Sequence, residues 1–276
     1  MKARTFARKM IDMITTPEMR VLPGQLAFFI VMSLIPLIAL SRMILSYIGV
    51  PISEIFLGSA IPKDVATVIN NIDSHSQGVN INLITFLILG FVLASNGAHS
   101  MIITSNEIYK LDSSDWLRRR IKAVLMTFIF VGVFLFILIV PVFGDSIFNV
   151  IRENVTNQNS IDILYRVYQL IKYPIILIII YLNIKMIYVM APDIKIKSKA
   201  TTKGALFTTI GWLIASEVYS IYTTYFVRYD VFYGSISSIL VLLIWVYLMA
   251  YIFSLGLIIN ATGTFEEQSK IENKGQ

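Results

Sequence analysis

Residues 236–262 read ISSILVLLIWVYLMAYIFSLGLIINAT and contain no charged side chain. The hydrocarbon core of a bilayer is about 30 Å thick, and an α-helix needs about 20 apolar residues to cross it. Lipid offers no hydrogen-bond partners to an open backbone, so such a stretch crosses as a helix. This segment therefore predicts a membrane span that ends close to the C-terminus.

Similar apolar stretches precede this one along the chain. They occupy residues 25–49, 81–105, 121–144, 173–191 and 204–227. The composition, 56% hydrophobic and only 14% charged, is far from that of a soluble domain. We expect an all-α polytopic bundle of six transmembrane helices in residues 25–262, with a cytoplasmic amphipathic segment (1–24) and a disordered cytoplasmic tail (263–276). Neither a separate soluble domain nor a cleavable signal peptide is expected.

Lysine and arginine are distributed unevenly between the two sides of this bundle. The N-terminal segment, the second and fourth connections and the tail carry sixteen of them, whereas the other connections carry five. Basic residues concentrate on the cytoplasmic side of membrane proteins. Both termini are therefore predicted to lie in the cytoplasm. This topology also explains the net charge of +6 without a nucleic-acid partner.

Three segments outside the spans have the spacing of amphipathic helices. Residues 2–16 place apolar and basic side chains on opposite helical faces, as expected for a helix on an anionic membrane surface. Residues 61–72 and 161–172 have one apolar face each, which predicts interfacial helices. For 161–172, an extension of the neighbouring span fits the pattern equally well.

A charged residue lies within the first predicted span, Arg42, and another within the fifth, Glu217. A charge in the bilayer centre costs about 2.5–3.5 kcal/mol on insertion scales. At a rise of 1.5 Å per residue, the depths of the two residues differ by only about 5 Å. We therefore expect a buried Arg42–Glu217 pair, either a structural ion pair or a contact to cargo. Pro36, also in the first span, should kink its helix.

The second span carries a polar stripe at helical spacing, which includes Asn96, His99 and Asn106. Lys185 in the fourth span and Asn260 in the sixth belong to the same half of the bundle. We expect these five residues to line a hydrated cavity open to the cytoplasm, in which Lys185 could meet an anionic headgroup. The alternatives are interhelical hydrogen bonds for the asparagines and a lysine that reaches the interface.

Motifs for metal or nucleotide chemistry are missing from the sequence. Cysteine is absent, and the two histidines, His75 and His99, are predicted on different sides of the membrane. Neither has the neighbouring ligands that a zinc site requires, and no glycine-rich phosphate loop is present. We expect no metal site, no cofactor and no catalytic residue.

The sixth span and its approach carry the clearest family motif: a tyrosine-glycine-serine entry, a central tryptophan, and a glycine before a terminal asparagine-alanine. The residues concerned are Gly234, Ser235, Trp245, Gly256 and Asn260. The first span, LPGQLAFFIVMSLIPLIAL (22–40), and the segment ASNGAHSMIITSNEIYKL (94–111) are also similar to one known family. The chain resembles the YihY/BrkB membrane family, whose older label is ribonuclease BN.

The resemblance implies a bacterial cytoplasmic-membrane protein of about six helices. It implies structural roles for Gly234, Trp245 and Gly256, and it links the family to virulence-type resistance and to export of lipid-like molecules. We expect a transporter or flippase-like exporter of an amphiphilic, lipid-related solute. Its partners would be membrane lipids and an amphiphilic or anionic lipid-like solute. The alternative is a non-transporting scaffold for envelope machinery; a homo-oligomer or an envelope-protein partner stays open. A membrane ribonuclease is disfavoured because RNA hydrolysis needs acid–base groups or metal ions placed at a phosphate.

Overall fold

The computed structural model describes residues 2–48, 83–112, 115–133, 158–225 and 237–272. Within these ranges the chain forms seven helices and no strand, which confirms the predicted all-α class. The helices are α1 (Lys2–Ile14), α2 (Pro17–Ile48), α5 (Leu83–Ile108), a helix over 116–133, α7 (Gln158–Met190), α8 (Thr202–Tyr225) and α10 (Ser237–Glu272).

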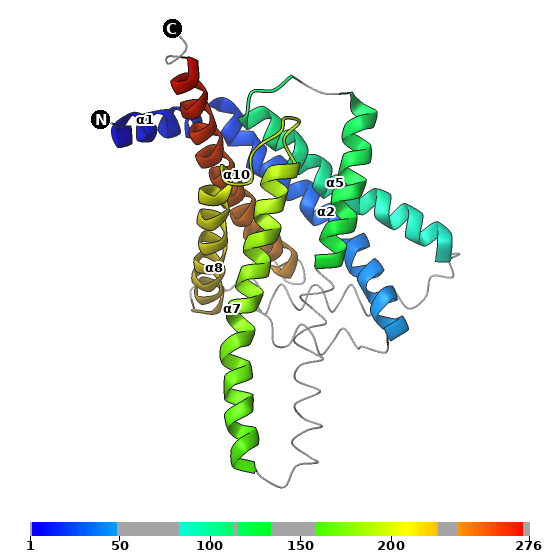
Figure 1. Ribbon diagram of the computed structural model, residues 1–276. Helices are drawn as coiled ribbons and strands as arrows, with labels where there is room; N and C mark the ends of the chain where they lie inside the picture. Colours follow the sequence, from blue (N-terminus) through cyan, green and yellow to red (C-terminus); the bar gives the residue numbers. More distant parts are fainter. Residues whose placement is uncertain (1, 49–82, 113–114, 134–157, 226–236, 273–276) are drawn as a thin grey trace.

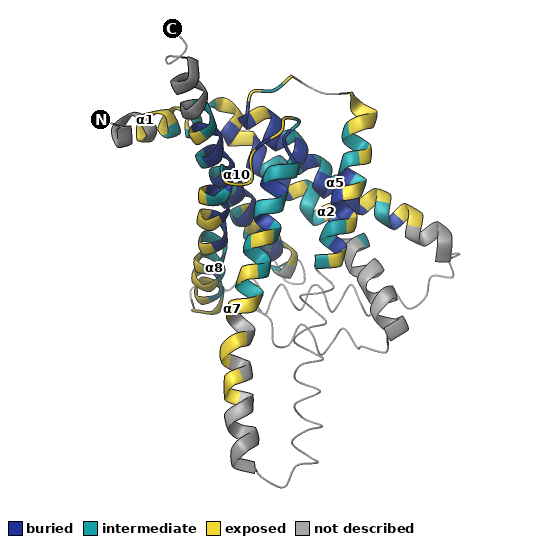
Figure 2. Cartoon of the chain, in the orientation of Figure 1, coloured by how far each residue is buried: buried dark blue, intermediate teal, exposed yellow. Residues whose placement is uncertain are grey.

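Helix α10 lies at the centre of the packing, with α8, α2, α1 and α5 against it (Figure 1). Its buried side chains include Phe253 and Leu257, which join Leu26 of α2, Ala98 of α5 and Tyr188 of α7 in one apolar core. Figure 2 shows this burial concentrated around α10 and where α2 passes α5, while the outer side of α8 is exposed. The core of the fold is thus built around α10.

Three of the described helices are long and apolar enough to cross a membrane: Ile88–Ile108, Thr202–Tyr225 and Ile239–Phe265. A fourth apolar helix, Pro174–Met190, is shorter. The six predicted spans are therefore confirmed only in part, because the remaining ones include residues outside the described ranges. The outer face of α8 exposes Ile210, Ile214 and Val218, which is the surface expected against lipid.

The N-terminal amphipathic helix is confirmed as α1. Arg8 and Lys9 are exposed, while Met10, Met13 and Ile14 pack against the core. The helix ends where the Thr15 hydroxyl donates to the carbonyl of Ile11 at 2.9 Å. Pro17 then opens α2, because a proline needs no hydrogen bond in a first turn.

Two predicted boundaries differ from the structure. Residues 161–172 form no separate interfacial helix; they belong to α7, so the alternative of an extended span is correct. The residues after 262 are helical through Glu272 instead of disordered. Glutamate and lysine favour helix and no proline interrupts them, and Phe265 packs edge-on against Tyr109, ring centroids 6.4 Å apart. The predicted interfacial helix at 61–72 lies outside the described residues.

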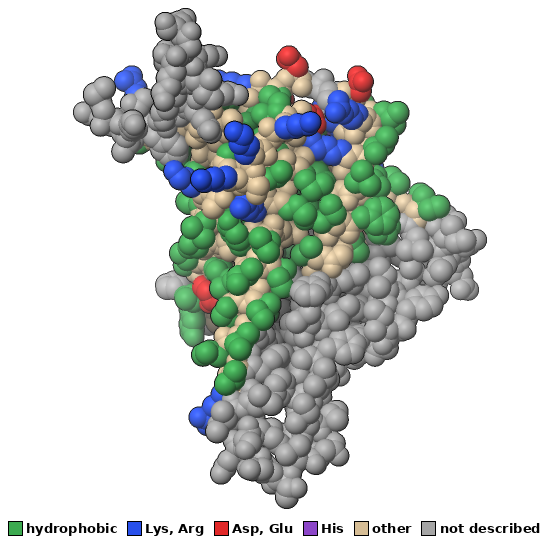
Figure 3. Space-filling model, in the orientation of Figure 1, with side chains coloured by type: hydrophobic (Ala, Val, Ile, Leu, Met, Phe, Trp, Pro, Cys, Tyr) green, Lys and Arg blue, Asp and Glu red, His purple; other side chains and the backbone are tan. Residues whose placement is uncertain are grey.

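Exposed basic side chains gather at one end of the molecule (Figure 3). This basic end comprises α1, the connection between α5 and the 116–133 helix, and residues 191–203 between α7 and α8 (Figure 1). Exposed apolar side chains cover α7 and α8 below it (Figure 3). The separation agrees with the charge asymmetry of the sequence.

Candidate functional site

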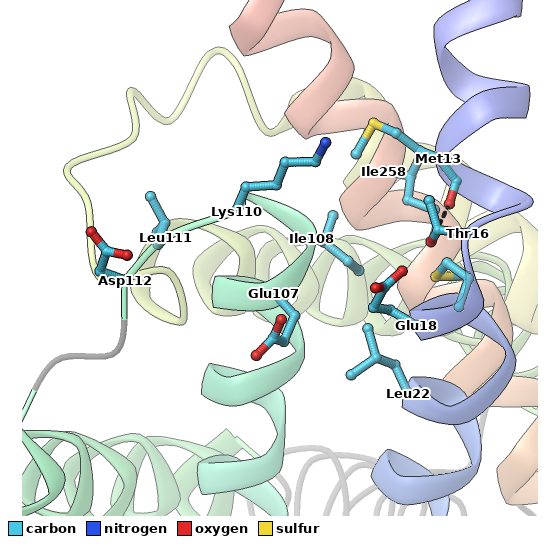
Figure 4. A pocket seen from close by; sticks show the side chains of 11 residues that line it. Met13, Thr16, Glu18, Leu22, Glu107, Ile108, Lys110, Leu111, Asp112 and Ile258 are labelled. Atoms are coloured by element: carbon cyan, nitrogen blue, oxygen red, sulfur yellow. Dashed lines mark hydrogen bonds between the residues drawn. The ribbon is translucent and has the colours of Figure 1, made fainter.

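A pocket of about 540 Å³ opens at the basic end. It lies where the turn between α1 and α2 meets the end of α5 and a residue of α10 (Figure 4). Its lining residues are Met13, Thr16, Glu18, Met19, Leu22, Glu107, Ile108, Lys110, Leu111, Asp112 and Ile258. These residues come from segments far apart in the sequence, so only the packed bundle creates the pocket.

The pocket combines an apolar interior with a charged rim. Met19, Leu22 and Ile258 are buried. The charged side chains at the rim are exposed: Glu18, Glu107, Lys110 and Asp112. Small-molecule sites typically join an apolar lining to a few polar groups that fix orientation. This pocket has the chemistry to hold an amphiphile whose polar group is cationic or zwitterionic.

Lys110 closes α5 in an unusual backbone conformation. Its φ is 54°, a left-handed value that glycine adopts freely and other residues rarely do. Its amide donates to the carbonyl of Glu107 at 3.0 Å, and the amide of Leu111 donates to that of Asn106 at 2.9 Å, which together form a Schellman cap. A lysine stands here where glycine is usual, with its side chain extended toward Met13 (Figure 4).

Lys110→Gly is expected to increase the free energy of unfolding by about 1 kcal/mol, because left-handed backbone costs an L-residue roughly 1–2 kcal/mol. Thermal unfolding of the purified protein in detergent measures this. Lys110→Ala is the control, since it removes the same charge but keeps the strain. A glycine variant no more stable than the alanine variant would contradict the assignment.

Asp193 joins three segments at the basic end. Its carboxylate accepts from Lys122 Nζ at 2.8 Å and from Asn106 Nδ2 at 2.7 Å, and its amide donates to Asn106 Oδ1 at 2.9 Å. Lys122 Nζ also donates to the carbonyls of Ala191 and Pro192, at 2.8 and 2.9 Å. We call Asn106, Lys122 and Asp193 the Asp193 junction; it ties α5 and the 116–133 helix to the end of α7.

A second junction holds α7, α8 and α10 together. The Tyr188 hydroxyl donates to the carbonyl of Phe253 at 2.8 Å and lies 2.6 Å from Thr208 Oγ1. Both polar atoms are directly beside Gly256, where a Cβ would collide with them. Nearby, the amide of Gly204 donates to Asn260 Oδ1 at 2.8 Å. The two glycines thus let α8 and α10 approach at backbone distance.

None of the five predicted cavity residues lines the pocket. Asn260 makes a hydrogen bond between α10 and α8, whereas Asn106 binds Asp193 in the connection after α7. Asn96 accepts from Arg120 Nη1 at 2.8 Å, and His99 is half-buried on the same helix. Lys185 is half-buried, its Nζ 5.7 Å from the centre of the Tyr181 ring. That they share a cavity stays a prediction.

The other predicted residues have mixed outcomes. Glu217 is exposed on α8 instead of buried. The side chain of Arg42 and the whole of Gly234 lie outside the described residues, so the Arg42–Glu217 pair stays a prediction. Helix α2 continues through Pro36. Trp245 Nε1 donates to Ser216 Oγ at 3.2 Å and so connects α10 to α8.

Metal-ligating side chains do not gather in the part of the chain that the structure describes. No group of three or more His, Asp or Glu there could hold an ion. The polar groups of the two junctions described above bind other parts of the chain.

The sequence reading missed Asp193, Lys122 and Tyr188 as interacting residues. One signal was available: Asp193 is an isolated carboxylate between Pro192 and a run of lysines, a setting that favours an ion pair with a distant cation. Lys122 was counted only toward membrane topology. Tyr188 lies in an apolar span, and no neighbouring residue in the sequence indicates that its hydroxyl forms hydrogen bonds.

Comparison with known proteins identifies the family. The family model described as Virulence factor BrkB matches residues 10–276. The ribonuclease-like protein YfkH of Bacillus subtilis (strain 168) is 28% identical over 265 residues, 93% of this chain and 94% of that protein. A UPF0761 membrane protein of Pseudoalteromonas translucida (strain TAC 125) is 31% identical over 71 residues, 26% of this chain and 24% of that protein. No solved structure matches. The chain therefore belongs to the BrkB virulence factor family.

Proposed function

We propose that this protein is a flippase-like transporter that moves an amphiphile across a bacterial cytoplasmic membrane without enzymatic chemistry. The observation that carries the proposal is the pocket of about 540 Å³, apolar inside and charged at its rim. It lies beside helices apolar enough to span a membrane. A solute with a hydrocarbon part and a charged part would be partly desolvated there before it enters the bundle.

The charge distribution supports a cytoplasmic opening. The pocket lies at the basic end, and basic residues favour the cytoplasmic side. The proposed topology has six membrane spans, with both termini in the cytoplasm. The rim carries Glu18, Glu107 and Asp112 against one lysine, Lys110, so the preferred solute carries a positive group, alone or in a zwitterion. This differs from the anionic solute that the sequence alone favoured.

Reconstituted liposomes test the proposal. The wild-type protein should move a fluorescent cationic amphiphile or a labelled zwitterionic phospholipid between leaflets faster than empty liposomes do. Thr16→Trp, which fills the pocket, should slow this movement at least fivefold. Asp112→Asn should slow it several-fold, whereas Asp115→Asn should not, because Asp115 is an exposed aspartate of the same connection that does not line the pocket.

Other outcomes would favour other functions. Well-folded protein with no flux, recovered with a stoichiometric envelope protein after gentle extraction, would support the scaffold instead. The name of the Bacillus subtilis relative calls it ribonuclease-like. An RNA-cleavage assay on the same purified protein separates that activity from transport, and flux that is equal in wild type and Thr16→Trp would overturn the role of the pocket.

A further inference from the structure

A second polar site lies on the flank of the molecule, between α5 and the 116–133 helix. Arg120 joins the two helices: its Nη1 donates to Asn96 Oδ1 and its Nη2 to the carbonyl of Val92, both at 2.8 Å. Phe91 and Phe128 stack across the same contact, ring centroids 4.3 Å apart. We call this contact the α5 seam; it shares no residue with the pocket.

Several polar atoms in the seam are buried without a hydrogen-bond partner. They are His99 Nε2, Ser100 Oγ and Arg119 Nε. The charges of Arg120 and Arg119 both act on the His99 ring, and Ser100 lies one helical turn beyond Asn96 on α5. Buried polar groups are normally hydrogen-bonded, and each exception needs an explanation such as a missing ligand. An N–H of arginine and a hydroxyl can both donate to an anion.

Within the described ranges the seam is electropositive and lacks an acidic partner. Among the described residues neither Arg119 nor Arg120 has a carboxylate within ion-pair distance. The nearby acid Asp193 is bound to Lys122. Arg119 and Arg120 are consecutive residues of the 116–133 helix, and an arginine can donate two parallel N–H bonds to a phosphate. The charge that would complete the seam is therefore negative.

The surroundings of the seam favour a lipid over a small ion. Val92 and Leu93 on α5, and Ile121 and Leu125 on the 116–133 helix, are exposed by 42%, 51%, 55% and 57%. They border the carbonyl to which Arg120 donates. A ligand with a phosphate at the arginines can therefore lay acyl chains along these side chains, whereas a free phosphate ion would leave them bare.

We propose that the α5 seam binds the phosphate of an anionic phospholipid through Arg119 and Arg120, with Ser100 and His99 completing the site. Bound there, the lipid links α5 to the 116–133 helix and fixes the flank of the bundle. This goes beyond the proposed transport: binding is measured without flux, so either proposal can fail alone.

The experiment is a binding titration of the full-length protein in detergent. Short-chain phosphatidylglycerol, short-chain phosphatidylcholine and inorganic phosphate are the three probes. We expect phosphatidylglycerol to bind at least tenfold more tightly than phosphatidylcholine. Arg119→Gln should weaken phosphatidylglycerol binding at least fivefold and Ser100→Ala about twofold. Arg118→Gln should change it less than twofold, because Arg118 is the exposed neighbour of the same charge.

Three results would overturn the proposal. Equal affinity of the wild type for the two lipids would show that the seam does not recognise charge. If Arg118→Gln and Arg119→Gln weaken phosphatidylglycerol binding equally, the lipid is attracted by the overall positive surface charge and not by a specific site. Inorganic phosphate that displaces the lipid at equal concentration would show an ion site without acyl contacts. Arg119→Lys keeps the charge but loses the two-pronged geometry, so it tests the site if Arg119→Gln fails to fold, with a loss of about threefold expected.

Discussion

Gly256→Ala is expected to destabilise the protein by about 2–3 kcal/mol, or to prevent its recovery in folded form. A Cβ at this position would collide with Thr208 Oγ1 and with the Tyr188 hydroxyl. Thr208 can rotate, but Tyr188 is a fully buried ring whose hydroxyl is bound to the carbonyl of Phe253. Overpacking a well-filled interior costs about 1–3 kcal/mol, and losing a buried hydrogen bond adds to this.

The measurement is the thermal unfolding midpoint in detergent, together with the yield of monodisperse protein. Gly263→Ala is the matched control, because Gly263 lies in the same helix and a Cβ there meets nothing within 4 Å. Alanine is up to about 1 kcal/mol better than glycine in a helix, so this control should be neutral or stabilising. If both variants unfold at the same temperature, α8 and α10 do not approach as closely as the structure shows.

Gly204 gives an independent check on the same contact. A Cβ there would collide with the carbonyl of Gly256 and with the side chain of Asn260. Because a backbone carbonyl cannot rotate away, Gly204→Ala should be at least as damaging as Gly256→Ala. A double variant should lose less than the sum of the two, since a single separation of the helices relieves both collisions.

The helices themselves could be predicted from the sequence because their cause is local. Hydropathy and helical spacing gave α1 and the spans around α5, α8 and α10. Gly256 and Asn260 were also singled out, because the family motif preserves their spacing. The structural role of these two residues depends on α8, which the motif does not include. Asn260 accepts a hydrogen bond from the amide of Gly204, which is far away in the sequence.

The direction in which a polar residue points could not be predicted in the same way. On α5, Asn96 turns to Arg120 and Asn106 turns to Asp193, and the polar stripe in the sequence reveals neither partner. Glu217 was expected inside because charge is costly in lipid, but it lies on the exposed face of α8. Helical spacing tells which residues share a face; it does not tell which neighbour that face meets.

The pocket was beyond prediction for a related reason. Its walls come from α1, α2, α5 and α10, so its volume depends on how the helix ends are placed relative to one another. The sequence did indicate a polar opening at the cytoplasmic side of the bundle. The residues that the sequence indicated for this opening are not those that line the pocket. Charged side chains such as Glu18 and Glu107 have the pattern of ordinary loop or helix-end charges.

Lys122→Met is expected to lower the free energy of unfolding by about 2–3 kcal/mol. The change removes the ion pair to Asp193 and both hydrogen bonds to the carbonyls of Ala191 and Pro192. Breaking a buried pair from one side costs about 3–5 kcal/mol, because the other charge stays unpaired. The two side chains keep 24% and 14% of their exposure, so solvent reduces that cost. The unfolding midpoint in detergent measures it.

A double-mutant cycle separates the ion pair from the rest of the Asp193 junction. Asp193→Asn should cost about as much as Lys122→Met, and the two together should cost about 1–2 kcal/mol less than their sum. Arg118→Met is the control: it removes a cation from an exposed position of the same helix, where little change is expected. Additive losses would mean that Lys122 stabilises the end of α7 through the two carbonyls alone, with Asp193 held independently by Asn106.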